Sequence, residues 1–225
     1  MTWTREAAEA LIQKFRIADD AVDAKERKRR KIIAAATKLF LRFGYRKTSI
    51  DEVARDANVA KGTVYLYFAS KPELLLYAVA AEKAPLVATF LDVMDEPDPR
   101  QRLWRYLYET ARAFSHMPLT TQFTLPGNEF EPVLAELSPD ITTLITEHRA
   151  EAFEYLLEPF VAAGDNRQQD IKHRSAALLG LIYTMPAALE KSIASGLDIN
   201  QAAKIYADML INGFAANPPT SNSPS

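Results

Sequence analysis

Residues 61–68 carry side chains that suit contact with nucleic acid. If this stretch is a helix, Val64 and Phe68 turn inward. The exposed side then carries Lys61, Gly62, Thr63, Tyr65 and Tyr67. An amine, hydroxyls and phenols, with a small residue near the N-terminus, suit a helix laid into a DNA major groove. An ordinary corner between two helices has the same apolar pattern, so both interpretations stay open.

A second short helix is predicted just before this stretch. Ser49 can cap its N-terminus, and Glu52 three residues later completes a capping box. Its apolar stripe consists of Ile50, Val53, Ala54 and Ala57. Asn58 stands where helices often end in the left-handed conformation. Two short helices joined by such a turn form a helix-turn-helix.

The charges of the chain are divided unevenly. Residues 25–71 hold 13 Lys and Arg against four Asp and Glu, a net charge of +9 in a chain whose total is −2. The remaining residues therefore carry −11, so a basic module is joined to an acidic body. Such a module attracts phosphates, and the basic run Arg27, Lys28, Arg29, Arg30 could contact the DNA backbone or minor groove.

The composition indicates an all-α protein. Hydrophobic residues make up 48% of the chain, there are only seven glycines, and no apolar run reaches the ~20 residues of a membrane span. Cysteine is absent, which excludes disulfides and thiol chemistry and fits a cytoplasmic protein. The N-terminus has no apolar segment that would indicate secretion, and no membrane partner is expected.

Further helices are expected along the rest of the chain. They cover about 27–43, 73–84, 98–116, 138–160, 168–194 and 199–215, with an irregular stretch at 117–132. Pro85 should bend or break its helix near residues 81–84. The predicted domains are a helical extension (1–24), a DNA-binding module (25–71), an effector-binding and dimerisation domain (72–216) and a disordered tail (217–225).

The sequence offers no catalytic constellation. His116, His148 and His173 lack acidic residues at metal-ligand spacing, so no metal site is expected. Neither a nucleophile elbow nor a glycine-rich phosphate loop is present. We therefore expect no enzymatic activity and no cofactor.

Several motifs of the basic module fall in one register. They are Phe40-Leu-Arg-Phe-Gly-Tyr, Thr48-Ser-Ile-Asp-Glu-Val-Ala, Val59-Ala-Lys-Gly-Thr-Val-Tyr-Leu-Tyr-Phe and Lys71-Pro-Glu-Leu-Leu. Together they resemble the DNA-binding domain of TetR-family transcriptional regulators, over about residues 30–79. Asn58 departs from the family pattern, which often has glycine there, but Asn tolerates the left-handed conformation.

The resemblance implies roles for individual residues. Thr48 and Ser49 would cap the first helix of the motif and touch a phosphate. Lys61, Gly62, Thr63 and Tyr65 would face the groove, with Leu66 at the groove edge. Tyr65, Tyr67 and Lys71 would contact phosphates, although the two tyrosines could instead pack under the next helix.

The resemblance also implies a homodimer and a small-molecule effector, apolar or aromatic. The two last helices would form the dimer interface through Ala176, Gly180, Ala187, Tyr206, Leu210 and Phe214. The effector pocket would be lined by Trp104, Tyr108, Phe123, Phe130, His148, Phe153 and Tyr183. Both sets could instead belong to the core of the monomer.

We therefore expect a homodimeric, sequence-specific DNA-binding regulator, typically a repressor, that a small molecule releases from a palindromic operator. One alternative is an all-α ligand-binding protein or enzyme with a non-functional helix-turn-helix corner. Another is a DNA-binding regulator controlled by a protein partner.

Overall fold

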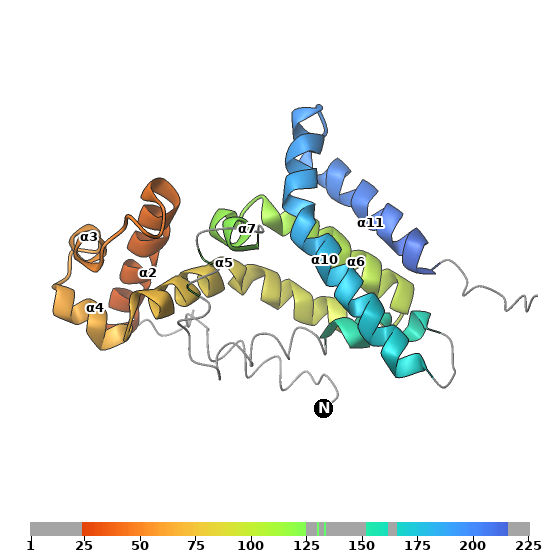
Figure 1. The fold of residues 1–225 in the computed structure, drawn as a ribbon, viewed down its shortest axis with the longest axis horizontal. Coiled ribbons are helices and arrows are strands. Elements are labelled where there is room, and N and C mark those ends of the chain that lie inside the picture. Colours follow the sequence, from red (N-terminus) through yellow and green to blue (C-terminus); the bar gives the residue numbers. More distant parts are fainter. Residues whose placement is uncertain (1–23, 125–129, 131–132, 134–151, 162–165, 216–225) are drawn as a thin grey trace, which may run out of the picture. The chain divides into compact units, whose positions relative to one another are not determined.

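The computed structural model describes residues 24–124, 130, 133, 152–161 and 166–215. Every regular element among them is a helix, which confirms the all-α class (Figure 1). Their contacts form two compact units. The described part of the N-terminal unit is 24–87, 116–124, 130 and 133, and that of the C-terminal unit is 88–115, 152–161 and 166–215. The division falls within one long helix, and the functional boundaries after residues 24, 71 and 216 stay predictions.

Helices α2 (Ala24–Phe43), α3 (Ile50–Asp56), α4 (Lys61–Tyr67) and the start of α5 (Lys71–Met94) form the N-terminal unit. Their inward faces share one core, which includes Ile32, Phe40, Val53, Val64, Phe68, Leu74 and Leu75. Helices of seven residues are marginal alone, and burying each large apolar side chain contributes about 1.5–3 kcal/mol. This core therefore holds α3 and α4 in place.

Residues 118–124 form α7 (Pro118–Thr124), so the prediction of an irregular stretch was wrong there. The carboxylate of Glu82 on α5 accepts the backbone N–H groups of Leu119 (3.1 Å) and Thr120 (2.8 Å). These are otherwise unsatisfied donors at a helix N-terminus. Leu119 is buried in the core of the N-terminal unit. The cap is 37 positions away in the sequence, which is why local pattern did not indicate this helix.

Helix α5 runs without interruption from Lys71 to Met94 and includes Pro85. Of the predicted bend or break near residues 81–84, the break was therefore wrong, and the bend stays a prediction. Proline removes one backbone donor and crowds the preceding turn. The other hydrogen bonds and the packed apolar side chains of this 24-residue helix outweigh that single loss.

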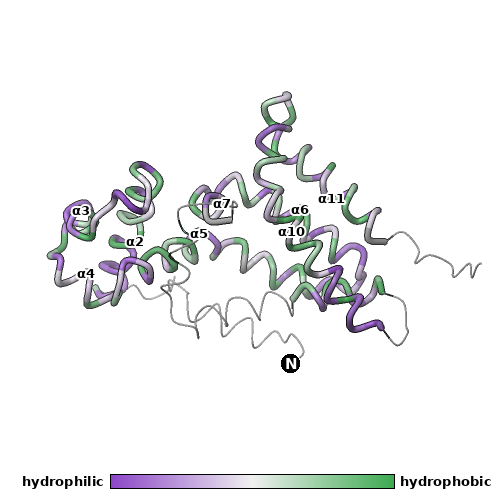
Figure 2. Tube along the Cα trace, viewed as in Figure 1, coloured by the Kyte–Doolittle hydropathy of each residue, from purple (hydrophilic) through white to green (hydrophobic). Residues whose placement is uncertain are grey.

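The C-terminal unit is built from α6 (Pro99–Phe114), α10 (Arg167–Ala194) and α11 (Ile199–Ala215), with a short 3₁₀ turn at Glu158–Phe160. The carboxylate of Asp98 caps α6 by accepting a hydrogen bond from the N–H of Gln101 at 2.9 Å. Hydrophobic and hydrophilic residues alternate along these helices (Figure 2). The alanines 202, 203 and 207 are buried on α11, so α6 can approach it closely.

The remaining predictions on secondary structure have mixed outcomes. The helices predicted at 168–194 and 199–215 are confirmed. Of the one predicted at 138–160, residues 152–157 are helical, while 138–151 lie outside the described residues, as do the extension 1–23 and the tail 216–225. No described helix combines the length and apolar character that crossing a membrane requires.

Candidate nucleic-acid interface

The turn between α3 and α4 is fixed by local hydrogen bonds. Ser49 Oγ accepts the N–H of Glu52 at 3.2 Å, and the Glu52 carboxylate accepts the N–H of Ser49 at 2.7 Å. The predicted capping box is therefore confirmed. Asn58 has φ 56°, the left-handed conformation expected of it. The N–H of Val59 then bonds to the carbonyl of Ala54 at 2.9 Å, which closes the turn of a helix-turn-helix.

Helix α4 divides into a buried and an exposed face as predicted. Val64 is buried on it, and Phe68 is buried just past its end. Its exposed face carries Lys61, Gly62, Tyr65 and Leu66, whereas Thr63 and Tyr67 are half-buried. A Cβ at Gly62 would meet no atom within 4 Å, so nothing in the described unit requires a glycine there. The space in front of Gly62 is open to an approaching partner.

Lys61 is held by a residue that the sequence did not indicate. Its Nζ donates to the Asp51 carboxylate at 2.7 Å, across from α4 to α3, and both side chains are exposed. This hydrogen bond, with the negative charge of Asp51, raises the pKa of Lys61. Lys61 is therefore charged at neutral pH, but its charge is partly neutralised until a phosphate or base competes for it.

Lys71 lies at the start of α5 with its ammonium 4.1 Å from the ring centroid of Tyr45. Tyr45 is buried and packs against Phe40 at 5.4 Å. The ring therefore positions the cation, a role of Tyr45 that we did not predict. Ser70 Oγ accepts the N–H of Glu73 at 3.2 Å and caps the helix. A phosphate contact by Lys71 stays a prediction.

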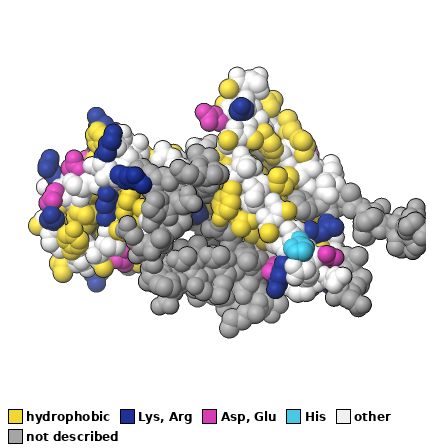
Figure 3. All heavy atoms as spheres, viewed as in Figure 1, with side chains coloured by type: hydrophobic (Ala, Val, Ile, Leu, Met, Phe, Trp, Pro, Cys, Tyr) yellow, Lys and Arg dark blue, Asp and Glu magenta, His cyan; other side chains and the backbone are white. Residues whose placement is uncertain are grey.

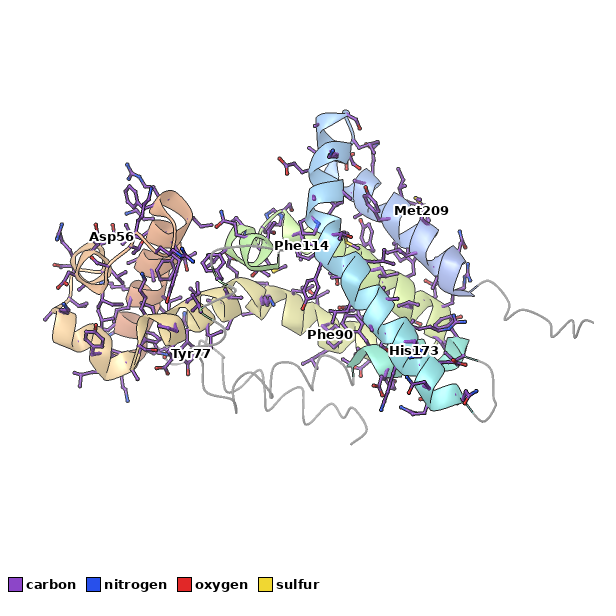
Figure 4. The ribbon with its side chains drawn as sticks, in the orientation of Figure 1. Asp56, Tyr77, Phe90, Phe114, His173 and Met209 are labelled. Carbon is purple, nitrogen blue, oxygen red and sulfur yellow. The ribbon has the colours of Figure 1, made fainter. Side chains whose placement is uncertain are left out.

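The basic run at the start of α2 is only partly available for contacts with phosphates. Arg27 and Lys28 are exposed. Arg29 and Arg30 each lie 3.6 Å from the Glu26 carboxylate, and the guanidinium of Arg29 covers the ring of Tyr77 at 4.5 Å. Tyr77, on α5, is labelled in Figure 4. Arg29 therefore ties α2 to α5, and a phosphate would have to compete with that contact.

Thr48 has a different role from the one implied by the resemblance. Its side chain is only 2% exposed, and its Oγ1 lies 2.8 Å from the carbonyl oxygen of Gly44 and 3.2 Å from that of Leu39. The hydroxyl therefore secures the end of α2 to the start of α3. The prediction that this side chain contacts a phosphate is wrong, because its hydroxyl is buried and already hydrogen-bonded.

On the face shown in Figure 3, Lys and Arg side chains gather over the N-terminal unit. Residues 32–78 match the family model for bacterial regulatory proteins of the tetR family. The HTH-type transcriptional regulator TtgW of Pseudomonas putida is 33% identical over 105 residues, which are 46% of this chain and 74% of TtgW. The chain belongs to the TetR family of bacterial transcriptional regulators.

Other HTH-type relatives are matched over smaller shares of their own length. The HTH-type transcriptional regulator YhgD of Bacillus subtilis is 56% identical over 43 residues, 19% of this chain and 22% of YhgD. The HTH-type transcriptional repressor KstR of Rhodococcus jostii is 32% identical over 104 residues, 46% of this chain and 49% of KstR. The chain thus spans less than two thirds of the length of either protein.

The crystal structure of NalD, the secondary repressor of the MexAB-OprM multidrug efflux pump in Pseudomonas aeruginosa, has the same fold. It superposes with a TM-score of 0.64 at 22% identity, over 84% of this chain and 95% of NalD. Because the TetR family consists of regulators, membership also confirms the prediction that the chain is not an enzyme.

The residues predicted to line an effector pocket are not all in one place. Trp104 stacks on Tyr108 at 4.9 Å, and its Nε1–H donates to Asp208 at 2.7 Å. Hydrogen bonds from Lys204 and then Trp104 lower the pKa of Asp208. Beside Trp104, an open hollow of about 280 Å³ is lined by Arg100, Gln101, Trp104, Asp208, Ile211 and Asn212. It is smaller than most ligand pockets, which measure roughly 300–1,000 Å³.

Phe130 was wrongly assigned to the effector pocket. It is buried in the core of the N-terminal unit and contacts Tyr45 edge to face at 5.9 Å. Phe153 is buried in the core of the C-terminal unit, and Tyr183 is half-buried. His148 and the side chain of Phe123 lie outside the described residues.

The residues predicted for the dimer interface fall into two groups. Ala176, Gly180 and Ala187 share an exposed stripe of α10. Tyr206 and Leu210 are half-buried, and the phenol of Tyr206 lies 3.0 Å from Ser192 Oγ, so it faces α10 of its own chain. The side chain of Phe214 lies outside the described residues. Sequence pattern missed the exposed hydrophobic residues of these two helices: Leu181, Ile193, Ile205 and Met209.

Proposed function

We propose that this TetR-family regulator is a homodimeric repressor that binds a palindromic operator and leaves it when a small apolar or aromatic molecule binds. The observation that carries the DNA-binding part is the exposed face of α4. Lys61, Gly62, Tyr65 and Leu66 face outward from α4, which a buried core holds in place beside α3 and its capping box. Such a helix suits insertion into the major groove, with surrounding cations on the phosphates.

Dimerisation is supported by the surface of α10 and α11. Ala176, Gly180 and Ala187 give α10 an exposed stripe of small side chains, against which another helix can pack closely. Ile205 and Met209 add exposed hydrocarbon on α11. Hydrophobic side chains are prominent over these helices in Figure 3. A second copy related by a two-fold axis would bury this surface and present two α4 helices to half-sites about one DNA turn apart.

Repression and effector control rest on the relatives and on the C-terminal unit. KstR is a transcriptional repressor by name, and NalD represses an efflux pump. The stacked pair Trp104 and Tyr108 offers an aromatic surface next to a hollow. Stacking on indole and phenol rings would favour flat or apolar effectors. Because the partner is chromosomal DNA, we place the protein in the cytoplasm.

Binding-site selection from random duplexes tests this proposal. The purified full chain should enrich a two-fold symmetric sequence, and sedimentation of the selected complex should give two chains per duplex. Aromatic and aliphatic molecules that raise the melting temperature of the free protein should also lower its affinity for that duplex. Enrichment of no sequence at all would contradict operator recognition.

A further inference from the structure

Leu66 is the most exposed large hydrophobic residue of the described chain, with 84% of its surface accessible. It lies on α4, four positions after Gly62 and directly after Tyr65, which is 47% exposed. Residues three and four positions apart share one face of a helix. The isobutyl side chain of Leu66 therefore stands on the same face as the open glycine, whereas the half-exposed phenol of Tyr65 lies about 100° around the helix.

The chemistry of leucine limits what this face can recognise. Leu66 has no hydrogen-bond donor or acceptor in its side chain, so it gains little from a phosphate or from the polar groups of a base edge. Among the groups that base pairs present in the major groove, the 5-methyl group of thymine is the apolar one. We propose that Leu66 reads the methyl group of a thymine in each operator half-site.

This inference rests on the proposed function, since it requires α4 to enter the major groove. The protein frame around Leu66 supports it. Val64 and Phe68, the residues two positions to either side, are buried and fix the rotation of α4. Apart from its chain neighbours and the backbone of α4 itself, no atom lies within 4 Å of the position that a Cβ of Gly62 would occupy, so this turn can approach the base edges closely. Contact with a methyl group would remove hydrocarbon of both partners from water.

The expected effect is small but measurable. Loss of one buried methyl group corresponds to about a fourfold loss of affinity. Replacing the contacted thymine with uracil in both half-sites should therefore lower the affinity roughly fifteenfold. Thr63 also carries a methyl group on α4, but it is half-buried, which makes it the natural control.

Uracil substitution in the selected operator tests the assignment. Uracil pairs with adenine as thymine does and lacks only the 5-methyl group, so a scan that replaces one thymine at a time isolates methyl contacts. Fluorescence anisotropy with the wild-type chain should reveal one position in each half-site at which uracil lowers the affinity about fourfold. That penalty should vanish in Leu66→Ala and persist in Thr63→Ser, which removes only the threonine methyl.

The outcomes separate this inference from the proposed function. Equal affinity for every uracil duplex, or an unchanged penalty in Leu66→Ala, would overturn the role of Leu66 while leaving DNA binding intact. Failure of the folded wild-type chain, verified by circular dichroism, to bind any duplex in a salt-dependent manner would overturn both.

Discussion

The two units both expose large hydrophobic side chains, but in different surroundings. On α4 of the N-terminal unit, Leu66 is accompanied by Lys61, Tyr65 and an open glycine. On α11 of the C-terminal unit, Ile205 and the 65%-exposed Met209 (labelled in Figure 4) are exposed, and helix α10 of the same unit carries its stripe of alanines and glycine. An isolated leucine among hydrogen-bond donors suits a mostly polar partner such as DNA. A run of hydrocarbon and small side chains suits a second helix surface.

If this comparison holds, the same chemical change should affect different properties in the two units. A carboxylate on α11 should separate the subunits, and a carboxylate on α4 should weaken DNA binding without affecting the dimer. Substitutions that remove a helix cap or an ion pair should have smaller effects.

The largest effect is expected from Met209→Asp. A buried carboxylate in a helix–helix interface is unfavourable, so the dimer should dissociate, and operator affinity should fall by about 100-fold or more because the two half-sites are no longer linked. Analytical ultracentrifugation and anisotropy measure the two effects. Asn200→Asp adds the same charge to an exposed position of α11 and should change neither. If the Met209→Asp variant were still a dimer, Met209 would not lie in the interface.

Leu66→Asp should reduce operator affinity by about tenfold or more, because it places a negative charge among phosphates and removes an apolar contact. Since Leu66 is almost fully exposed, the melting temperature and the sedimentation coefficient should stay at the wild-type values. Wild-type affinity in this variant would show that α4 does not enter the groove. Loss of the dimer would show that the two surfaces are not separate.

Ser49→Ala should lower the free energy of unfolding by about 1 kcal/mol, as loss of an N-cap typically does. Urea denaturation followed by circular dichroism provides the measurement. Ser115→Ala is the matched control, because that hydroxyl donates to the carbonyl of Arg112 at the end of α6 and caps no N–H group. Equal losses in the two variants would mean that the capping box contributes nothing particular to α3.

Asp51→Asn should have the smallest effect. It releases Lys61 from its 2.7 Å ion pair and removes a negative charge near the phosphates, so duplex affinity should rise a few-fold at low salt. The affinity should rise for both operator and random duplexes. Asp56→Asn makes the same change at the other end of α3, where Asp56 pairs with Lys38 of α2, and should alter duplex affinity less. A loss of affinity in Asp51→Asn would instead show that Asp51 orients Lys61 for binding.

The N-terminal unit could be predicted from sequence because its structure depends on neighbours in the chain. The capping box joins Ser49 and Glu52, which are only three positions apart. The left-handed turn depends on the backbone conformation of one residue, Asn58. The inward positions Val64 and Phe68 follow from helical periodicity. In such segments the residue types themselves determine where helices begin, turn and end.

Other features depend on contacts that no local pattern reveals. The cap of α7 by Glu82 joins residues 37 and 38 positions apart, and the bond from Trp104 to Asp208 spans 104 positions. Phe130 was assigned to the wrong unit because an aromatic residue outside a periodic segment gives no sign of the core it enters. Lys61 was predicted to face outward, but its partner Asp51 could be identified only once α3 and α4 were placed.

The central claim is that the basic N-terminal unit binds duplex DNA through its phosphates, and the salt dependence of binding tests it most directly. Log affinity of the wild-type chain should fall linearly with log salt. Lys71→Gln should reduce that slope by about one, whereas Lys204→Gln, the same change on α11, should leave it unchanged. Binding that is insensitive to salt, or equal slopes in wild type and Lys71→Gln, would contradict the account.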